Sequence, residues 1–269
     1  MELRIGDGEM KQISKHGYPP VNRCIYCDKY HNETKLTREH IVAKSIGGDV
    51  TLAKSSCIPC AHITRDIEQF CFREMLGAFR IRFGFRKSHP KGDPVKVHLK
   101  YLDGFQHFQH LPTDQHPSIL TVPKAPPPQL LFGKAPDLNF ITAWSYVPDP
   151  EAIKKFPQGT RIGGHQFRAD TYGRMIAKIA HAFACAEMGH AAFEHLLPPI
   201  ILEERSDVFD YVGCLGQEAA DLPAEPGCLH RVHLETSPDL PGFVLANIRL
   251  FAQFGAPQYH VVVGKAELG

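Results

Sequence analysis

Two pairs of cysteines, with a Glu-His dipeptide between them, are the residues of this sequence best suited to chemistry. Each pair has the spacing C-x2-C, and 29 residues separate Cys24 and Cys27 from Cys57 and Cys60. Four thiolates at this spacing suit a tetrahedral Zn²⁺ site, and four protein ligands leave no open position, so we expect a structural zinc. Four buried free cysteines are the alternative, which two identical spacings disfavour.

Glu39 and His40 lie between the pairs, and a helix expected after Cys60 adds His62 and Asp66. Glu39, His62 and Asp66 offer the oxygen and imidazole ligands that suit a catalytic metal, and positions four residues apart share a helix face. On a strand His40 points away from Glu39, so it can act on a water as a general base. Hard ligands of this kind predict Mg²⁺ or Mn²⁺. Together these residues predict metal-assisted hydrolysis, with nucleic acid as the expected substrate.

The charge distribution favours phosphate binding by the cysteine-containing part of the chain. The net charge is only +1, but the first 100 residues hold 18 basic and 11 acidic side chains, against 12 and 18 in the rest. A basic segment is typical of contact with a phosphate backbone, although surface charge also fluctuates by chance. The cations that flank the expected site are the candidates for nucleic-acid binding: Arg38, Lys44, Lys54 and Arg65.

Composition indicates a folded protein of a reducing compartment. The hydrophobic fraction is 43%, enough for an ordinary core, and four of the 8 cysteines are scattered rather than arranged as a disulfide framework. The first residues are charged and lack the apolar stretch of a signal peptide. No apolar run approaches the roughly 20 residues that span a bilayer. We therefore expect a cytoplasmic protein that does not contact membranes; its oligomeric state is not indicated.

Hydrophobic patterning predicts the elements that position the candidate residues. Residues 36–42 and 50–53 are expected to be short strands, joined through the turn at Gly47 and Gly48, where tandem glycines allow positive φ. From residue 61 the apolar period becomes helical. The best helix in the chain is expected at 168–188. Further strands are expected at 210–214, 229–234, 242–251 and 258–263, with a second short helix at 190–197.

These elements predict an α+β protein in three parts. Residues 1–20 are expected to be a flexible arm, residues 21–88 a zinc-stabilised domain with a trailing basic helix, and residues 89–269 a mixed strand and helix domain of unknown role. The phenylalanines between the arginines of 73–87 are expected to be core. His181 lies on the apolar helix, and His190 and His195 follow it. A second metal site is the alternative there, but satisfied or surface histidines are expected, since no Cys or Asp spacing supports a ligand set.

The order of the motifs resembles the HNH endonuclease family over about residues 22–70. The resemblance rests on Cys24-Ile-Tyr-Cys27, on Arg38-Glu39-His40-Ile41-Val42 followed by Gly47-Gly48, and on Cys57-Ile-Pro-Cys60. It implies a ββα-metal fold, often stabilised by a four-cysteine zinc site. It also implies that Glu39 is the acidic metal ligand, His40 the general base and His62 the second metal ligand.

Two positions depart from the pattern of that family. The family often has Asn or His directly after the last cysteine, where this chain has Ala61. Its central Asn, behind the base histidine, has no match among Thr51, Leu52 and Ala53. Two functions therefore remain open: a metal-dependent endonuclease that hydrolyses DNA, and a catalytically degenerate HNH-fold zinc module that binds DNA or protein.

Overall fold

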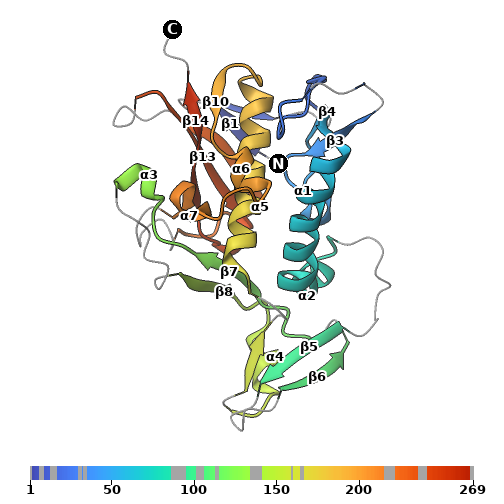
Figure 1. Ribbon diagram of the computed structural model, residues 1–269. Coiled ribbons are helices and arrows are strands. Elements are labelled where there is room, and N and C mark those ends of the chain that lie inside the picture. Colours follow the sequence, from blue (N-terminus) through green and yellow to red (C-terminus); the bar gives the residue numbers. More distant parts are fainter. Residues whose placement is uncertain are drawn as a thin grey trace.

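The structure is a computed structural model of the chain, and it mixes strands and helices as the sequence predicts. Figure 1 shows its elements, coloured along the sequence from blue at the N-terminus to red at the C-terminus. The residues that it describes are 2–5, 9–12, 17–29, 32, 35–85, 95–100, 106–112, 115–133, 141–158, 160–163, 167–214, 222–235 and 241–266.

A ββα unit carries the cysteine pairs and the Glu-His dipeptide. Strand β3 (Leu36–His40) pairs antiparallel with β4 (Thr51–Cys57), and α1 (Ile58–Phe70) follows β4 without a loop. Pro59 stands in the first turn of α1, where its missing N–H costs nothing. Between the strands, the chain turns through a 3-10 helix at Lys44–Ile46. Gly48 closes this turn, because a Cβ there would lie 2.0 Å from the carbonyl oxygen of Val42.

The helix continues past α1 with a change of pitch. Residues Cys71–Met75 form a π-helical turn, and α2 (Gly77–Arg82) follows. Phe79 of α2 is fully buried and meets the rings of Phe251 and Phe254 edge-on, at centroid distances of 5.5 and 5.2 Å. The prediction of a core role is therefore confirmed for Phe79, and this contact joins the ββα unit to the C-terminal part of the chain.

A seven-stranded sheet dominates the C-terminal part. Its order is β10-β14-β13-β12-β1-β2, with β11 paired to β14, and only the β1–β12 pair is parallel among these pairings. Its strands are β1 (Glu2–Ile5), β2 (Glu9–Gln12), β10 (Phe193–His195), β11 (Val212–Gly213), β12 (His230–Glu235), β13 (Phe243–Leu250) and β14 (Tyr259–Ala266).

Helix α5 (Ala169–Glu187) lies between the ββα unit and the large sheet. It packs against α1 on one side and against β13 and β14 on the other, and Figure 1 shows it running through the middle of the molecule. Every residue from 171 to 185 is buried. A helix covered on all sides is usually apolar all round, so Lys178 and His181, both fully buried here, must find polar partners inside the protein.

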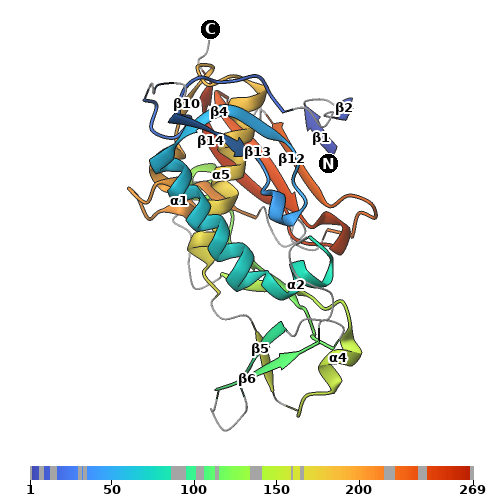
Figure 2. The same ribbon diagram turned by 90° about the vertical axis from the view of Figure 1, so that its right-hand side faces the viewer.

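Smaller elements complete the chain. Two further sheets are antiparallel: one joins β5, β6 and β9, and the other joins β7 and β8. The β5–β6 pair lies at the end of the molecule remote from β10 (Figure 2). These elements are β5 (Val95–Lys100), β6 (Gln106–Leu111), β7 (Leu120–Lys124), α3 (Gln129–Phe132), β8 (Thr142–Tyr146), α4 (Pro150–Lys154), β9 (Arg161–Gly163), α6 (Pro198–Ile201), α7 (Val208–Tyr211) and a 3-10 helix at Ala252–Phe254.

The structure differs from the predicted elements in three places. Within the expected flexible arm, 2–5 and 9–12 are strands of the large sheet, because β1 finds a parallel partner in β12. The short helix expected at 190–197 is instead edge strand β10, which pairs with β14. The strand expected at 210–214 is α7 followed by a two-residue β11. Strands β1, β10 and β11 each pair with a strand distant in the sequence, which local patterning does not reveal.

The buried residues of the ββα unit and of the C-terminal sheet form one continuous hydrophobic cluster. The C-terminal part therefore forms much of the environment in which the ββα unit sits. Of the helices in the described part of the chain, none has both the length and the apolar character needed to span a membrane.

Candidate functional site

The four cysteines of the two C-x2-C pairs come together at one end of the ββα unit. Their sulfur atoms all lie within 4.8 Å of one another, and Sγ of Cys27 is 3.8 Å from Sγ of Cys57. The first pair is held against β4 by a hydrogen bond from the Ile25 amide to the Ser55 carbonyl, 2.8 Å long. Cys57 ends β4 and Cys60 lies in the first turn of α1, so the strand-to-helix junction positions the side chains of the second pair.

The electrostatics of this cluster favour a thiolate. The hydrogen bond from Cys60 lowers the pKa of Cys24 to about 4, against the opposing effect of burial, and backbone amides contribute further. The same hydrogen bond raises the pKa of Cys60, and burial raises that of Cys27, so the negative charge of the cluster is favoured at Cys24. Four convergent cysteine sulfurs are the donor set of a tetrahedral zinc site. The residues therefore fit the zinc that the spacing predicts, and Cys24, Cys27, Cys57 and Cys60 would hold it.

Strand alternation places Glu39 and His40 on opposite faces of β3, as predicted. Glu39 is only 6% exposed and faces α5, where it meets a buried ammonium group. Nζ of Lys178 lies 2.6 Å from Oε1 of Glu39 and 2.8 Å from Oε1 of Glu68, and it also donates to the backbone carbonyl of His40. An ammonium has three hydrogens, so Lys178 has one acceptor for each.

The pKa directions at this ion cluster follow from burial and charge. Burial raises the pKa of Glu39, and the positive charge of Lys178 opposes that rise. Burial acts to lower the pKa of Lys178, but the two carboxylates outweigh it and raise the pKa above its ordinary value. The lysine therefore stays charged, and Glu39 is an ion-pair partner inside the core.

The structure does not bring His62 and Asp66 to Glu39. Both are exposed on α1, and Oδ1 of Asp66 accepts a hydrogen bond of 3.1 Å from Arg65. Glu68 faces Lys178, and at about 100° per residue His62 lies about 120° and Asp66 about 160° round the helix from it. Ala61, two turns before Glu68, shares its face instead.

The predicted ligand set of the catalytic metal is therefore not formed. Among the described residues, the groups of three or more ligand atoms close enough for one ion are the four cysteines and a His/Cys cluster, neither of which contains Glu39, His62 or Asp66. There are two physical reasons: the phase of α1 carries His62 and Asp66 away from Glu39, and the Glu39 carboxylate is held in an ion pair by Lys178. A divalent Mg²⁺ or Mn²⁺ ion does not fit this arrangement.

His40 faces an open pocket on the other side of β3. The cavity has a volume of about 470 Å³, and Arg38, two residues earlier on the same strand face, lines it together with Lys44. Burial lowers the pKa of the half-buried His40, and the charge of Lys178 lowers it further, so the imidazole is neutral near pH 7. The other lining residues are Gly17, Tyr18, Gly48, Asp49, Thr51 and Ala53.

The predicted nucleic-acid contacts divide into two groups. Arg38 and Lys44 are exposed and stand beside His40 in the pocket, where they outnumber the one carboxylate of its lining, Asp49. Lys54 and Arg65 do not line it, and Arg65 pairs with Asp66 at 3.1 Å. The pocket therefore combines a neutral imidazole with two cations, which suits an anionic ligand with a proton to transfer.

Comparison with known proteins supports the assignment of the N-terminal part. Residues 24–74 match the family model described as HNH endonuclease. No curated protein and no solved structure matches the chain. The matched segment contains both cysteine pairs, the β3–β4 hairpin and α1, so this part of the chain is an HNH domain with a four-cysteine cluster, of a kind associated with nuclease-type function.

Sequence reasoning missed two residues of this region, Lys178 and Glu68. Lys178 interrupts the most apolar helix of the chain, and a lone charge there is a signal of a buried partner. The helical period of this segment was assigned to an apolar face that does not include Glu68, so the inward orientation of Glu68 was not predicted. Neither signal alone names Glu39 as the partner, which lies 139 positions before Lys178.

Proposed function

We propose that this protein is a nuclease whose HNH domain hydrolyses phosphodiester bonds, with DNA as the expected substrate. The main observation in support of this proposal is that His40 lines an open pocket beside Arg38 and Lys44. The match of residues 24–74 to the HNH endonuclease model supports the reaction class. The reduced thiols that a four-cysteine zinc site needs fit the cytoplasm.

The pocket supplies binding and proton transfer. Arg38 and Lys44 hold the phosphate and offset its negative charge, as cations do along a nucleic-acid backbone. Neutral His40 accepts a proton from the attacking water at the imidazole lone pair, a role worth about 10²–10⁴-fold in rate. Zinc, when bound by the four cysteines, supplies folding energy and holds the β4–α1 junction, and takes no part in the reaction.

The C-terminal part positions this site. Lys178 donates to the backbone carbonyl of His40 and so anchors the end of β3 from the side opposite the pocket. Mg²⁺ or Mn²⁺ is the cofactor that the resemblance implies. Since Glu39 is neutralised by Lys178, no step is assigned to such an ion, and the metal requirement is an outcome of the test.

A second candidate function is nucleic-acid binding without cleavage. The observation that favours it is the same ion cluster: Glu39, the acidic ligand of the family pattern, is buried against Lys178. In this case the basic pocket would bind phosphate while the domain lacks the electrophile that active relatives use.

Cleavage and binding assays on the full-length, zinc-loaded chain separate the two. Labelled single- and double-stranded DNA and RNA are incubated with Mg²⁺, with Mn²⁺ or with a chelator too weak to extract the zinc, and binding is followed by anisotropy. Cleavage that disappears in His40→Ala, with binding retained, supports the nuclease. Binding without cleavage under all three conditions supports the second candidate, and neither binding nor cleavage contradicts both.

A further inference from the structure

A second group of metal-ligand side chains lies outside the HNH motif, between α5 and β10. His181 and Cys185 are one helical turn apart on α5, and His195 ends the edge strand β10. One ligand atom from each lies within 4.8 Å of the other two. His181 is fully buried, Cys185 is 3% exposed and His195 is half-buried.

Hydrogen bonds fix the tautomer of both imidazoles. Nε2 of His181 lies 2.7 Å from the carbonyl oxygen of Ile25, and Nε2 of His195 lies 2.6 Å from that of His190. A carbonyl oxygen only accepts, so each Nε2 carries the proton and each Nδ1 presents its lone pair. Metal-binding histidines usually donate their other ring N–H to a carbonyl or carboxylate in this way.

One of these lone pairs has no partner. Nδ1 of His181 is buried and has no hydrogen-bond partner among the described residues. An unsatisfied polar atom in a protein core costs free energy and calls for an explanation such as an ion. The Cys185 thiol lies beside the same ring, with Sγ 3.7 Å from Nε2 of His181. The His181 ring and the Cys185 thiol therefore lie close enough together to contact one ion.

We propose that His181, Cys185 and His195 bind a second divalent metal ion of borderline-soft character, Zn²⁺ being the fitting one. Two imidazoles and one thiolate are ligands that zinc accepts readily. In tetrahedral geometry, bond lengths of about 2.1 Å to nitrogen and about 2.3 Å to sulfur place the ligand atoms about 3.4–3.6 Å apart. From separations of up to 4.8 Å the cluster closes on an ion with side-chain shifts of up to about one ångström, and Cys185 releases its thiol proton to solvent on binding.

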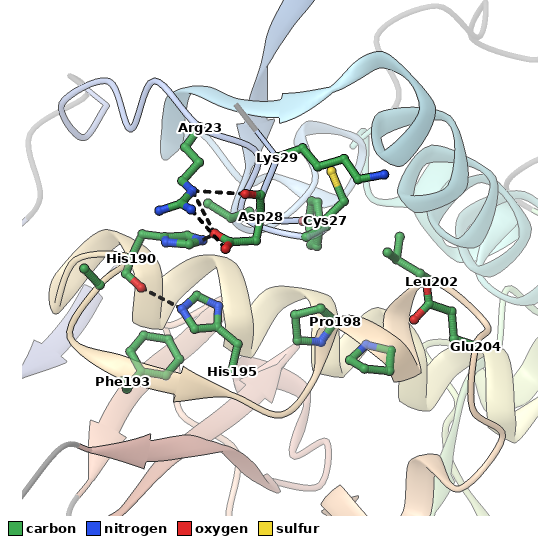
Figure 3. A pocket seen from close by; sticks show the side chains of 14 residues that line it. Arg23, Cys27, Asp28, Lys29, His190, Phe193, His195, Pro198, Leu202 and Glu204 are labelled. Carbon is green, nitrogen blue, oxygen red and sulfur yellow. Dashed lines mark hydrogen bonds and ion pairs between the residues drawn. The ribbon is translucent and has the colours of Figure 1, made fainter. Parts of the chain in front are cut away.

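A cavity next to the cluster gives the ion its access route. It has a volume of about 600 Å³, and His195 lines it together with His190, Phe193 and Asp28. Figure 3 shows His195 at the wall of this pocket with its hydrogen bond to the His190 carbonyl, and Asp28 on the opposite side. With three protein ligands, the fourth coordination position is left to a water or a small ligand from this pocket.

The site would connect three parts of the chain. Cys185 and His181 belong to α5, His195 to the three-residue strand β10, and the Ile25 carbonyl to the first zinc knuckle. A bound ion would therefore tie the edge of the large sheet to the central helix, next to the four-cysteine cluster. This role is independent of nuclease activity.

Metal stoichiometry of the full-length chain tests the proposal. The wild type is expected to hold two zinc ions per chain after dialysis into metal-free buffer, measured by elemental analysis, and Cys185→Ser and His195→Gln one each. Cys214→Ser, another buried cysteine placed outside both clusters, is the matched control and should keep two. Titration of Co²⁺ into protein carrying one zinc should give a thiolate-to-cobalt absorption band that Cys185→Ser lacks.

Stability supplies the second readout. The second equivalent of Zn²⁺ should raise Tm of the wild type and of Cys214→Ser, and leave Tm of His195→Gln unchanged, since ions that bind only the folded state stabilise it. His195 is half-buried, so its variant tests the site even where Cys185→Ser fails to fold. One zinc per chain in the wild type, or two in folded His195→Gln, would overturn the proposal.

Discussion

Replacement of Lys178 by methionine should destabilise the protein far more than loss of an ordinary lysine. Nζ of Lys178 is fully buried, and Glu39 beside it is 6% exposed. Lys178→Met fills a similar volume but leaves the Glu39 carboxylate buried without its counter-ion. Removal of one partner of a buried pair costs about 3–5 kcal/mol. For a chain of this length that corresponds to a fall in Tm of roughly 6–20 °C.

The pH dependence of the stability loss in Lys178→Met tests whether the Glu39 carboxylate causes it. Burial raises the pKa of Glu39 above the ordinary value of 4.5, and Lys178 opposes that rise, so the variant carboxyl should have a still higher folded-state pKa. A carboxyl group whose pKa is higher in the folded state than in the unfolded state contributes stability at pH values below its unfolded-state pKa. That stability is lost as the pH rises through its folded-state pKa. The deficit of Lys178→Met should therefore widen from pH 5 to pH 8.

Guanidinium unfolding of the zinc-loaded protein measures these effects. The control is Lys154→Met, an exposed lysine that pairs with Glu151 at 2.5 Å on α4 and should cost well under about 1 kcal/mol. Glu39→Gln combined with Lys178→Met should recover part of the loss, because no charge is then left unpaired at position 39. A deficit below about 1 kcal/mol, or one that does not change with pH, would refute the reasoning.

Three further predictions concern the zinc cluster, the basic pocket and the core. Cys57→Ser should lower the zinc content by one ion per chain and unfold the HNH domain, because a structural zinc supplies its folding energy; unchanged zinc by elemental analysis would rule out this ligand. Arg38→Ala should weaken DNA binding in anisotropy titrations and reduce the slope of log K against log salt concentration by about one unit. Arg65→Ala should change neither the affinity nor the slope. Equal effects of the two substitutions would show that the pocket is not the DNA-binding site. Phe79→Ala should cost about 3–5 kcal/mol in guanidinium unfolding, since its ring is fully buried; a loss near zero would mean that α2 is not docked on the C-terminal sheet.

Local patterns in the sequence predicted the HNH domain well. Two equal cysteine spacings predicted the four-cysteine cluster, and strand alternation correctly placed His40 and Glu39 on opposite faces of β3. The helix predicted at 168–188 agrees with α5 to within a residue at each end, because its apolar run is long and strongly periodic.

Interactions between distant parts of the chain explain what the sequence did not reveal. The assignment of His62 relied on its place at the start of the helix, two residues after Cys60, whereas the phase of α1 turns it away from Glu39 and puts Glu68 there instead. Strand β10 lacks a strand pattern of its own and exists because β14 pairs with it. Cys185 stands one helical turn after His181 in the sequence, a spacing that the sequence analysis did not recognise, and only the fold adds His195 as a third donor.

The rate of plasmid nicking as a function of pH tests the central claim most directly. Since the folded environment lowers the pKa of His40 below 6.5, the account predicts a rate that is already maximal at pH 7 and falls only at more acidic pH. In His40→Ala the rate should drop about 10²–10⁴-fold, and the fall in rate at acidic pH should be absent. Nicking by a folded, zinc-loaded His40→Ala at the wild-type rate would contradict the account.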